Sequence, residues 1–530
     1  MKTYFKKISV SIIAAAGLVL FNGCDLDIND NPNLATGAVV TPNYVFPAVV
    51  ATTMYNQVNY YGYASAAYFV GYQVPGAGIG GFGDVFSNSI SSSFNTGAWT
   101  AVFSDLRDLQ TIIRKAEEDP QYVVYGAISQ VWKSYLYQLL VDIYGDVPYL
   151  EALGGGSGNF SPKYDKDSDV YQYLVADLDI AITTLKANLN TSGLALLTST
   201  TDPVFKGDLA KWVKFANNLK LRLLVRARGT VIDSFVQSEF GKFSSDGFLK
   251  ENVLVQPGYN ASSRENPFWE IYHSSVAGSN TQAANYYIPS CYVFAFYNGT
   301  KLNDPVRGAL TYKSFPNTPR WSLADQSAGQ PYTEKYTWHV GTGSGVNASV
   351  AKGILKSRAA ASPLVLAAET YFLLAEAALF DHALDGDAKS NFEKGIEASF
   401  AYLELEGTAT APPDVTAEVA EYFKLNSDNY LVNFDKATTT EQKLEAIITQ
   451  KYLALNIIGS HEAWTEFRRT TYPTISGTDS LTTFASTQSS SPRPDKLLIR
   501  QIYPQNERDL NENAPLIRDG FSNPIFWDKD

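Results

Sequence analysis

The residues best suited to hold a ligand in this 530-residue chain are aromatic and polar side chains in its irregular middle region. The faces of Trp and Tyr rings stack on the apolar C–H faces of sugar rings, while amide and guanidinium groups form hydrogen bonds with hydroxyls. This mixture predicts reversible binding of a polyhydroxylated ligand. The candidates in the middle region are Trp269, Asn285, Tyr287, Arg320, Trp321 and Trp338.

The patterns that look like catalytic or cofactor motifs are incomplete. Residues 76–81 match a dinucleotide-binding fingerprint by letter, but a Ser-rich stretch follows where a helix must begin. His461-Glu462 lacks the second His of a zinc protease motif. Glu462 and Glu466 lie one helical turn apart, which is too local to act on a glycosidic bond from two sides. We therefore expect no catalytic activity and no cofactor.

Metal and nucleic-acid binding are also disfavoured. The two Cys and four His residues are scattered without metal-ligand spacing. Residues 165–169 begin like a calcium loop but lack its Gly and its final Glu, so the start of a helix is the better interpretation. The oxygen-rich residues 27–33 leave calcium open as an alternative. A net charge of −12 provides no positive field for nucleic acid.

The elements that position the candidates are helices. Apolar residues recur at helical spacing in four segments, 128–143, 209–223, 366–380 and 444–455. Gly145 and Gly459 mark expected helix ends, and Asp208 is an expected N-cap. Trp residues on periodic segments are expected in the core, and these are Trp132, Trp212 and Trp464.

Two long regions, 71–98 and 256–350, show no sustained period. We expect long ordered loops there, with one small sheet that includes the strand-like residues Tyr292–Phe296. Long structured loops on a helical scaffold usually carry the binding site.

The N-terminus predicts export. Lys2, Lys6 and Lys7 precede the apolar stretch Ile8–Phe21, which is too short for a stable membrane span. Cys24 follows Gly23, as in bacterial lipoprotein signals, although Phe21 and Asn22 depart from the usual residues. We therefore expect residues 1–23 to be a signal peptide, residues 24–530 to be one domain, and Cys24 to be lipidated.

The segment Leu139–Tyr149, LLVDIYGDVPY, is the most characteristic of an ordered set of motifs. Residues 302–307 read LNDPVR, a turn motif with an inserted Val. Further motifs lie in order along nearly the whole chain, at residues 27–33, 98–106, 161–171, 211–222, 363–377 and 503–511. The set resembles the SusD/RagB family of nutrient-binding outer-membrane lipoproteins, whose patterns include LDxYGDVPY and the turn LNDPR.

This resemblance implies an all-α fold in which tetratricopeptide-like helix pairs form a scaffold for ligand-binding loops. It also implies a surface location on the outer membrane and a SusC-like TonB-dependent transporter as partner. Trp99 lies close to the position of a stacking aromatic in the family, and Tyr60, Tyr61 and Tyr63 are possible neighbours. The expected function is oligosaccharide capture and delivery to the transporter. Peptide capture, as in RagB-like members, and a surface glycoside hydrolase are the alternatives.

Overall fold

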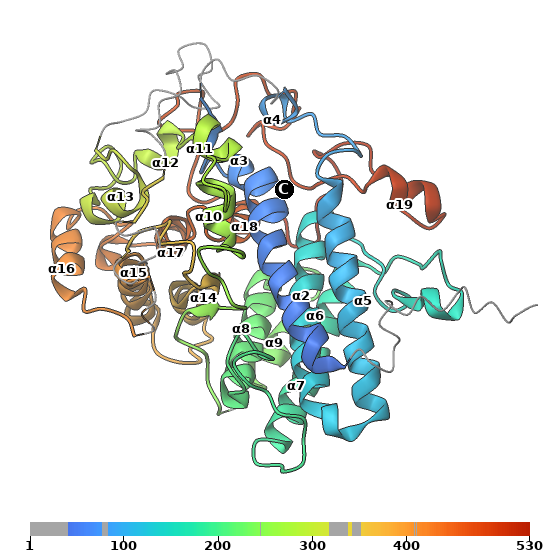
Figure 1. The fold of residues 1–530 in the computed structure, drawn as a ribbon. Helices are drawn as coiled ribbons and strands as arrows, with labels where there is room; N and C mark the ends of the chain where they lie inside the picture. Colours follow the sequence, from blue (N-terminus) through green and yellow to red (C-terminus); the bar gives the residue numbers. More distant parts are fainter. Residues whose placement is uncertain are drawn as a thin grey trace, which may run out of the picture. The chain divides into compact units, whose positions relative to one another are not determined.

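Helix α6 (Val123–Tyr144) is central to the first half of the structure because its side chains are apolar on nearly every face. Helices α5 and α7 pack against it, and α8 packs against α7. Figure 1 shows α2, α5, α6 and α7 as long helices lying side by side. The helices of this half are α2 (Pro42–Asn56), the π-helical stretch η1 (Gln57–Ala66), α3 (Ala67–Phe69), α4 (Gly83–Ser87), α5 (Thr96–Glu118), α7 (Asp167–Ala187), α8 (Leu209–Ala227) and α9 (Asp233–Phe240).

The computed structural model describes residues 41–76, 83–243, 245–316, 338–341, 351–407, 409 and 411–529. The chain divides at Pro42, and the residues from Pro42 onward form one unit. This unit is mainly helical with a few short strands, which confirms the expected all-α class with a minor β element.

The second half is built around α14 (Ala367–Leu379), which packs against α15 (Ala388–Glu404) and α17 (Thr440–Ala454). Its other helices are α10 (Pro267–Tyr272), α11 (Gln282–Tyr286), α12 (Cys291–Phe294), α13 (Pro305–Thr311), α16 (Thr416–Leu425), α18 (Ser460–Thr470) and α19 (Gln505–Leu510). Short 3-10 turns are η2 (Pro120–Tyr122), η3 (Gly154–Ser157) and η6 (Phe434–Lys436).

Two small antiparallel sheets tie distant segments together. β1 (Val74–Pro75) pairs with β3 (Tyr287–Ile288), and Val74 lies opposite Ile288. β2 (Val253–Val255) pairs with β4 (Ser362–Val365). The first sheet therefore joins the two loop-rich regions expected at 71–98 and 256–350.

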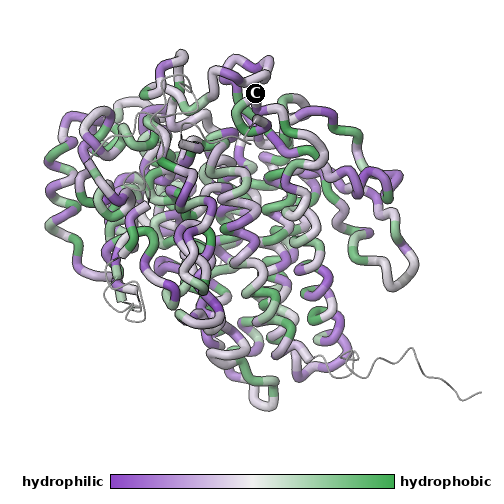
Figure 2. Tube along the Cα trace, turned by 45° about the horizontal axis from the view of Figure 1, so that its top comes forward, coloured by the Kyte–Doolittle hydropathy of each residue, from purple (hydrophilic) through white to green (hydrophobic). Residues whose placement is uncertain are grey.

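The four predicted helices are present as α6, α8, α14 and α17, each within a few residues of its expected ends. Gly145 caps α6 with φ +78°, and Asp208 accepts a hydrogen bond from the backbone N–H of Lys211 as the N-cap of α8. Trp132, Trp212 and Trp464 are buried, as expected. Among the described residues, no helix is long and apolar enough to cross a membrane. Hydrophobic and hydrophilic residues are mixed along the helices in Figure 2.

The strand expected at Tyr292–Phe296 is wrong, because this segment begins as helix α12. Ser290 caps the helix by accepting a hydrogen bond from the N–H of Val293. The aromatic and β-branched residues that suggested a strand are buried on all sides. A short apolar run of this kind has no period that separates a strand from a buried helical turn.

Candidate ligand-binding site

The structure brings two of the predicted aromatic residues into one cluster. Tyr63 of η1 packs edge-on against Tyr287, with ring centroids 5.4 Å apart, and against Tyr272 of α10 at 5.8 Å. Tyr272 in turn packs edge-on against Trp338 at 6.0 Å. Tyr287 and Trp338 are therefore linked through Tyr63 and Tyr272, at the sheet that joins the two loop-rich regions.

The rings of this cluster are covered. Tyr287 is 2% exposed and Trp338 is 1% exposed, so neither offers an open face for stacking in this structure. Trp269, which is 3% exposed, packs against His273 and donates a hydrogen bond from Nε1 to Ser274 Oγ at 3.1 Å. Their role in binding stays a prediction that requires the covering segments to move.

The surface beside the cluster is polar. The half-buried Asn285 accepts a hydrogen bond from Asn280 Nδ2 at 3.4 Å, and Tyr63 donates from its hydroxyl to Gln282 Oε1 at 3.0 Å. Tyr286 is exposed next to them. These groups are capable of exchanging hydrogen bonds with ligand hydroxyls.

Trp99 lies in a different aromatic group. On α5 it packs edge-on against Tyr144 and Tyr503, with ring centroids at 5.1 and 5.7 Å, and it is 5% exposed. The structure therefore places Trp99 in the core between α5 and α6, and its stacking role is a prediction. Arg320, Trp321 and Cys24 lie outside the described residues.

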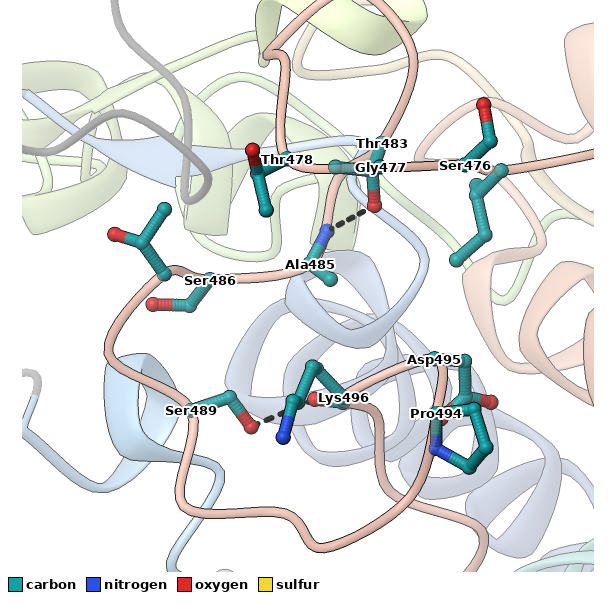
Figure 3. Close-up of a pocket in the computed structure, with 12 residues that line it drawn as sticks. Ser476, Gly477, Thr478, Thr483, Ala485, Ser486, Ser489, Pro494, Asp495 and Lys496 are labelled. Carbon is teal, nitrogen blue, oxygen red and sulfur yellow. Dashed lines mark hydrogen bonds between the residues drawn. The ribbon is translucent and has the colours of Figure 1, made fainter.

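A hydroxyl-lined pocket lies in the segment after α18 (Figure 3). Its cavity is about 410 Å³, and most of its polar lining is supplied by Ser and Thr side chains. Ser489 Oγ donates to the carbonyl oxygen of Lys496 at 2.7 Å, and Thr483 Oγ1 accepts from the N–H of Ala485 at 3.0 Å. The lining residues are Ile475, Ser476, Gly477, Thr478, Thr483, Ala485, Ser486, Thr487, Ser489, Pro494, Asp495 and Lys496.

The first loop-rich region holds this pocket in place. Asn88 Nδ2 donates to Ser489 Oγ at 3.2 Å and to the carbonyl oxygen of Lys496 at 2.9 Å. Ser490 donates from both its N–H and its hydroxyl to the carbonyl oxygen of Ser87, at 2.7 and 2.9 Å. Phe484 is buried beneath the segment, where it packs edge-on against Tyr292 at 5.2 Å.

The chemistry of the pocket suits binding rather than proton transfer. Asp495 is the one carboxylate among the pocket's described lining residues, and Arg493 holds it through a hydrogen bond of 2.9 Å. The guanidinium donates to both carboxylate oxygens, so Asp495 is already engaged within the protein. Several hydroxyls that both donate and accept fit a polyhydroxylated ligand.

Sequence reasoning missed this pocket. The Ser- and Thr-rich composition of residues 470–491 was the available signal, since a dense run of hydroxyl side chains between buried segments indicates an ordered polar loop. The loop's packing against Asn88 depends on contacts more than 400 residues apart in the chain, which local patterns do not encode.

The carboxylates on α18 are structural. Glu466 is buried, and although burial would raise its pKa, Arg469, Lys451 and Arg226 hold that pKa well below its usual range. Glu462 is also buried, and it pairs with Arg226 at 2.5 Å. In the part of the chain that the structure describes, no group of three or more His, Cys, Asp or Glu residues could hold a metal ion.

Comparisons with known proteins agree on the fold. A search of curated protein sequences found no match. A SusD homologue from Bacteroides uniformis has a TM-score of 0.68 and 22% identity, covering 92% of this chain and 99% of that one. A chitin-binding SusD homologue from Flavobacterium johnsoniae has a TM-score of 0.66 and 20% identity, covering 92% and 97%.

A SusD homologue from Bacteroides vulgatus gives a TM-score of 0.66 and 19% identity over 91% and 97% of the two chains. The helix pairs of this fold are tetratricopeptide-like, as expected. A family model described as "Starch-binding associating with outer membrane" matches residues 33–504, and the chain therefore belongs to the SusD-like family.

Proposed function

We propose that this protein captures oligosaccharides at the cell surface and delivers them to a SusC-like TonB-dependent transporter. The observation that carries this proposal is the family match over residues 33–504, whose description names starch binding and the outer membrane. Two structural neighbours are named for chitin binding, which supports a glycan as the ligand class.

The Ser/Thr-lined pocket beside Asn88 is the proposed place of contact. Its hydroxyls exchange hydrogen bonds with sugar hydroxyls, and no covalent step takes place. The aromatic cluster of Tyr63, Tyr287 and Trp338 is the proposed stacking surface, exposed when the segments over it open. Trp99, Trp269, Asn285, Arg320 and Trp321 remain proposed ligand contacts.

Isothermal titration tests the ligand class. We expect binding of maltohexaose or chitohexaose, no binding of an unstructured hexapeptide, and no sugar products after prolonged incubation. Binding of the peptide alone would replace the proposal with peptide capture. Release of shorter sugars would replace it with glycoside hydrolysis.

Two pocket variants test the place of contact. Thr478 and Thr487 are exposed residues of the pocket lining, and Val is nearly isosteric with Thr. We expect the double variant Thr478→Val, Thr487→Val to bind the sugar about tenfold more weakly, because two hydrogen bonds are lost. Thr300→Val, on an exposed turn outside the pocket, is the matched control. If the double variant and Thr300→Val bind the sugar with equal affinity, the sugar does not contact Thr478 or Thr487.

The membrane arrangement is tested separately. We propose that an acyl chain on Cys24 holds the protein at the outer membrane and that residues 1–23 are removed. We expect Cys24→Ala to shift the protein from the membrane fraction to the soluble fraction of cells, and we expect the unchanged protein to co-purify with an outer-membrane barrel. A Cys24→Ala variant that stays in the membrane fraction contradicts the anchor.

A further inference from the structure

A second cavity, far in sequence from the Ser/Thr-lined pocket, lies between α5, α6 and the loop that follows α6. Its volume is about 450 Å³. Gln110 and Arg114 stand one turn apart on α5, and Lys133 faces them from α6. Tyr149 and Leu150 lead the loop that closes the other side. Figure 1 shows α5 and α6 side by side.

The charged side chains among the described lining residues of this cavity are both cationic. Arg114 and Lys133 are its two charged lining residues, and the described lining includes no carboxylate. The exposed Arg114 has neither a hydrogen bond from its side chain nor an ion pair with any residue that the structure describes. In a protein of net charge −12, such a pocket is a local positive site against an overall negative field.

Lys133 is held in place without a direct ion pair to any residue that the structure describes. Its Nζ donates to Gln110 Oε1 at 3.0 Å and lies 5.6 Å from the ring centroid of Tyr149. Burial lowers the pKa of Lys133, and the more distant charges of Asp177 and Glu117 offset this only in part. Asp177 itself accepts hydrogen bonds from Gln130 and Tyr149. An anion in the cavity would therefore find an ammonium with unused donors.

The rest of the lining is apolar or small. Leu150 is 64% exposed, and Ala152, Leu153, Gly154 and Gly156 continue the wall. The exposed Leu150 provides apolar contact for the C–H face of a sugar ring, whereas the ring of Tyr149 already stacks on Tyr173 with centroids 5.6 Å apart. An apolar wall with two cations at one end matches a ligand that has both an apolar face and an anionic group.

We propose that this cavity binds an acidic saccharide, with Arg114 and Lys133 holding its carboxylate or sulfate group and the Leu150–Leu153 wall contacting its ring. The inference rests on the proposed glycan-binding function but assigns a separate site with a different charge preference. In the Ser/Thr-lined pocket, by contrast, Asp495 pairs with Arg493, and we expect that pocket to bind neutral sugars.

Titration calorimetry on the full chain tests this site with four probes: trigalacturonate, a sulfated disaccharide, inorganic sulfate and neutral maltotriose. We expect Arg114→Gln to weaken binding of the acidic saccharides about tenfold, because a charge-assisted hydrogen bond is lost. Lys115→Gln removes the same charge from the next residue of α5, where Lys115 pairs with Glu118 outside the cavity, and it is expected to leave affinity unchanged.

The outcomes separate the two proposals. If Arg114→Gln and Lys115→Gln bind trigalacturonate with equal affinity, the acidic-saccharide site is overturned. In that case, binding of maltotriose still supports the proposed function. Sulfate ion that binds as tightly as either saccharide also overturns it, since the cavity then selects a free anion. Failure of every sugar, neutral and acidic, overturns both proposals.

Discussion

At the scale of single residues, the interior is held by a buried ionic network that joins five helices. Arg226 of α8 pairs with Glu462 at 2.5 Å and Glu466 at 3.1 Å, and also with Asp142 of α6. Arg469 binds both carboxylate oxygens of Glu376 at 2.7 Å. Further members on α8, α14 and α17 are Arg222, Glu369 and Lys451.

Removing Arg226 leaves three carboxylates together without this cation. We expect Arg226→Met to lower the free energy of unfolding by about 3–5 kcal/mol, the usual cost of leaving a buried charge uncompensated. Urea unfolding measures this. The control is Lys424→Met, which breaks the exposed Lys424–Glu421 pair and is expected to cost less than about 1 kcal/mol. Similar losses in both variants would contradict a stabilising role for the network.

The buried carboxyl of Asp105 is expected to make the free energy of unfolding depend on pH. Burial raises its pKa from 3.8 to about 6, although hydroxyls of Thr52 and Thr53 donate to it. The folded state therefore binds this proton more tightly than the unfolded state. The resulting stabilisation of the fold is present below pH 4 and is lost as pH rises through 6. We expect Asp105→Asn to remove about 2–3 kcal/mol of pH-dependent stability between pH 4 and 7, measured by urea unfolding. Glu118→Gln, on the same helix, is expected to show the same change of unfolding free energy with pH as the wild type. If Asp105→Asn also shows that change, Asp105 is not the source of the pH dependence.

At the scale of elements, sequence reasoning located the helices whose apolar periodicity is strong. α6, α8, α14 and α17 follow from spacing alone, because burial of one face or all faces imposes that spacing. α12 was mistaken for a strand, since aromatic and β-branched residues in a short buried run fit either element.

The site was harder to predict because its parts come from distant segments. Trp338 and Tyr287 lie in one region of the sequence, but they are linked through Tyr63 and Tyr272, which come from other elements. The Ser/Thr-lined pocket depends on contacts between residues 87–88 and 489–496. Local composition shows which residues are suited to binding, whereas tertiary packing decides which of them reach the surface.

A substitution at Gly71 tests whether close packing between the first loop-rich region and the segment of the Ser/Thr-lined pocket matters for stability. It has φ +73°, and a Cβ there would lie 2.3 Å from the Cβ of Phe484, beneath the Ser/Thr-lined pocket. We expect Gly71→Ala to push Phe484 aside, to cost about 2–3 kcal/mol and to weaken sugar binding. Gly229→Ala has a similar φ of +72° but open space around the new Cβ, so only backbone strain of about 1 kcal/mol is expected. Urea unfolding and calorimetry compare them; equal losses would mean that the contact with Phe484 does not matter.

At the scale of the whole molecule, the C-terminal segment closes the unit by returning to its first helices. The N–H of Gln501 donates to the carbonyl oxygen of Ile143 at 3.0 Å. Phe526 packs edge-on against Tyr171 of α7 at 4.9 Å, and its N–H donates to Asp167. The guanidinium of Arg468 lies 3.7 Å from the ring of Trp464 and 4.8 Å from that of Trp527.

This closure makes stability depend on the last residues of the chain. Trp527 is 2% exposed, and replacing it with Ala removes a large buried ring and the second aromatic face beside Arg468. We expect Trp527→Ala to lower the free energy of unfolding by about 3–5 kcal/mol, as for other buried aromatic residues. Leu516→Ala, in the same segment but 63% exposed, is expected to change it by less than about 0.5 kcal/mol. If Trp527→Ala unfolds at the wild-type urea concentration, the C-terminal segment contributes little to the fold, and the helices alone hold the unit together.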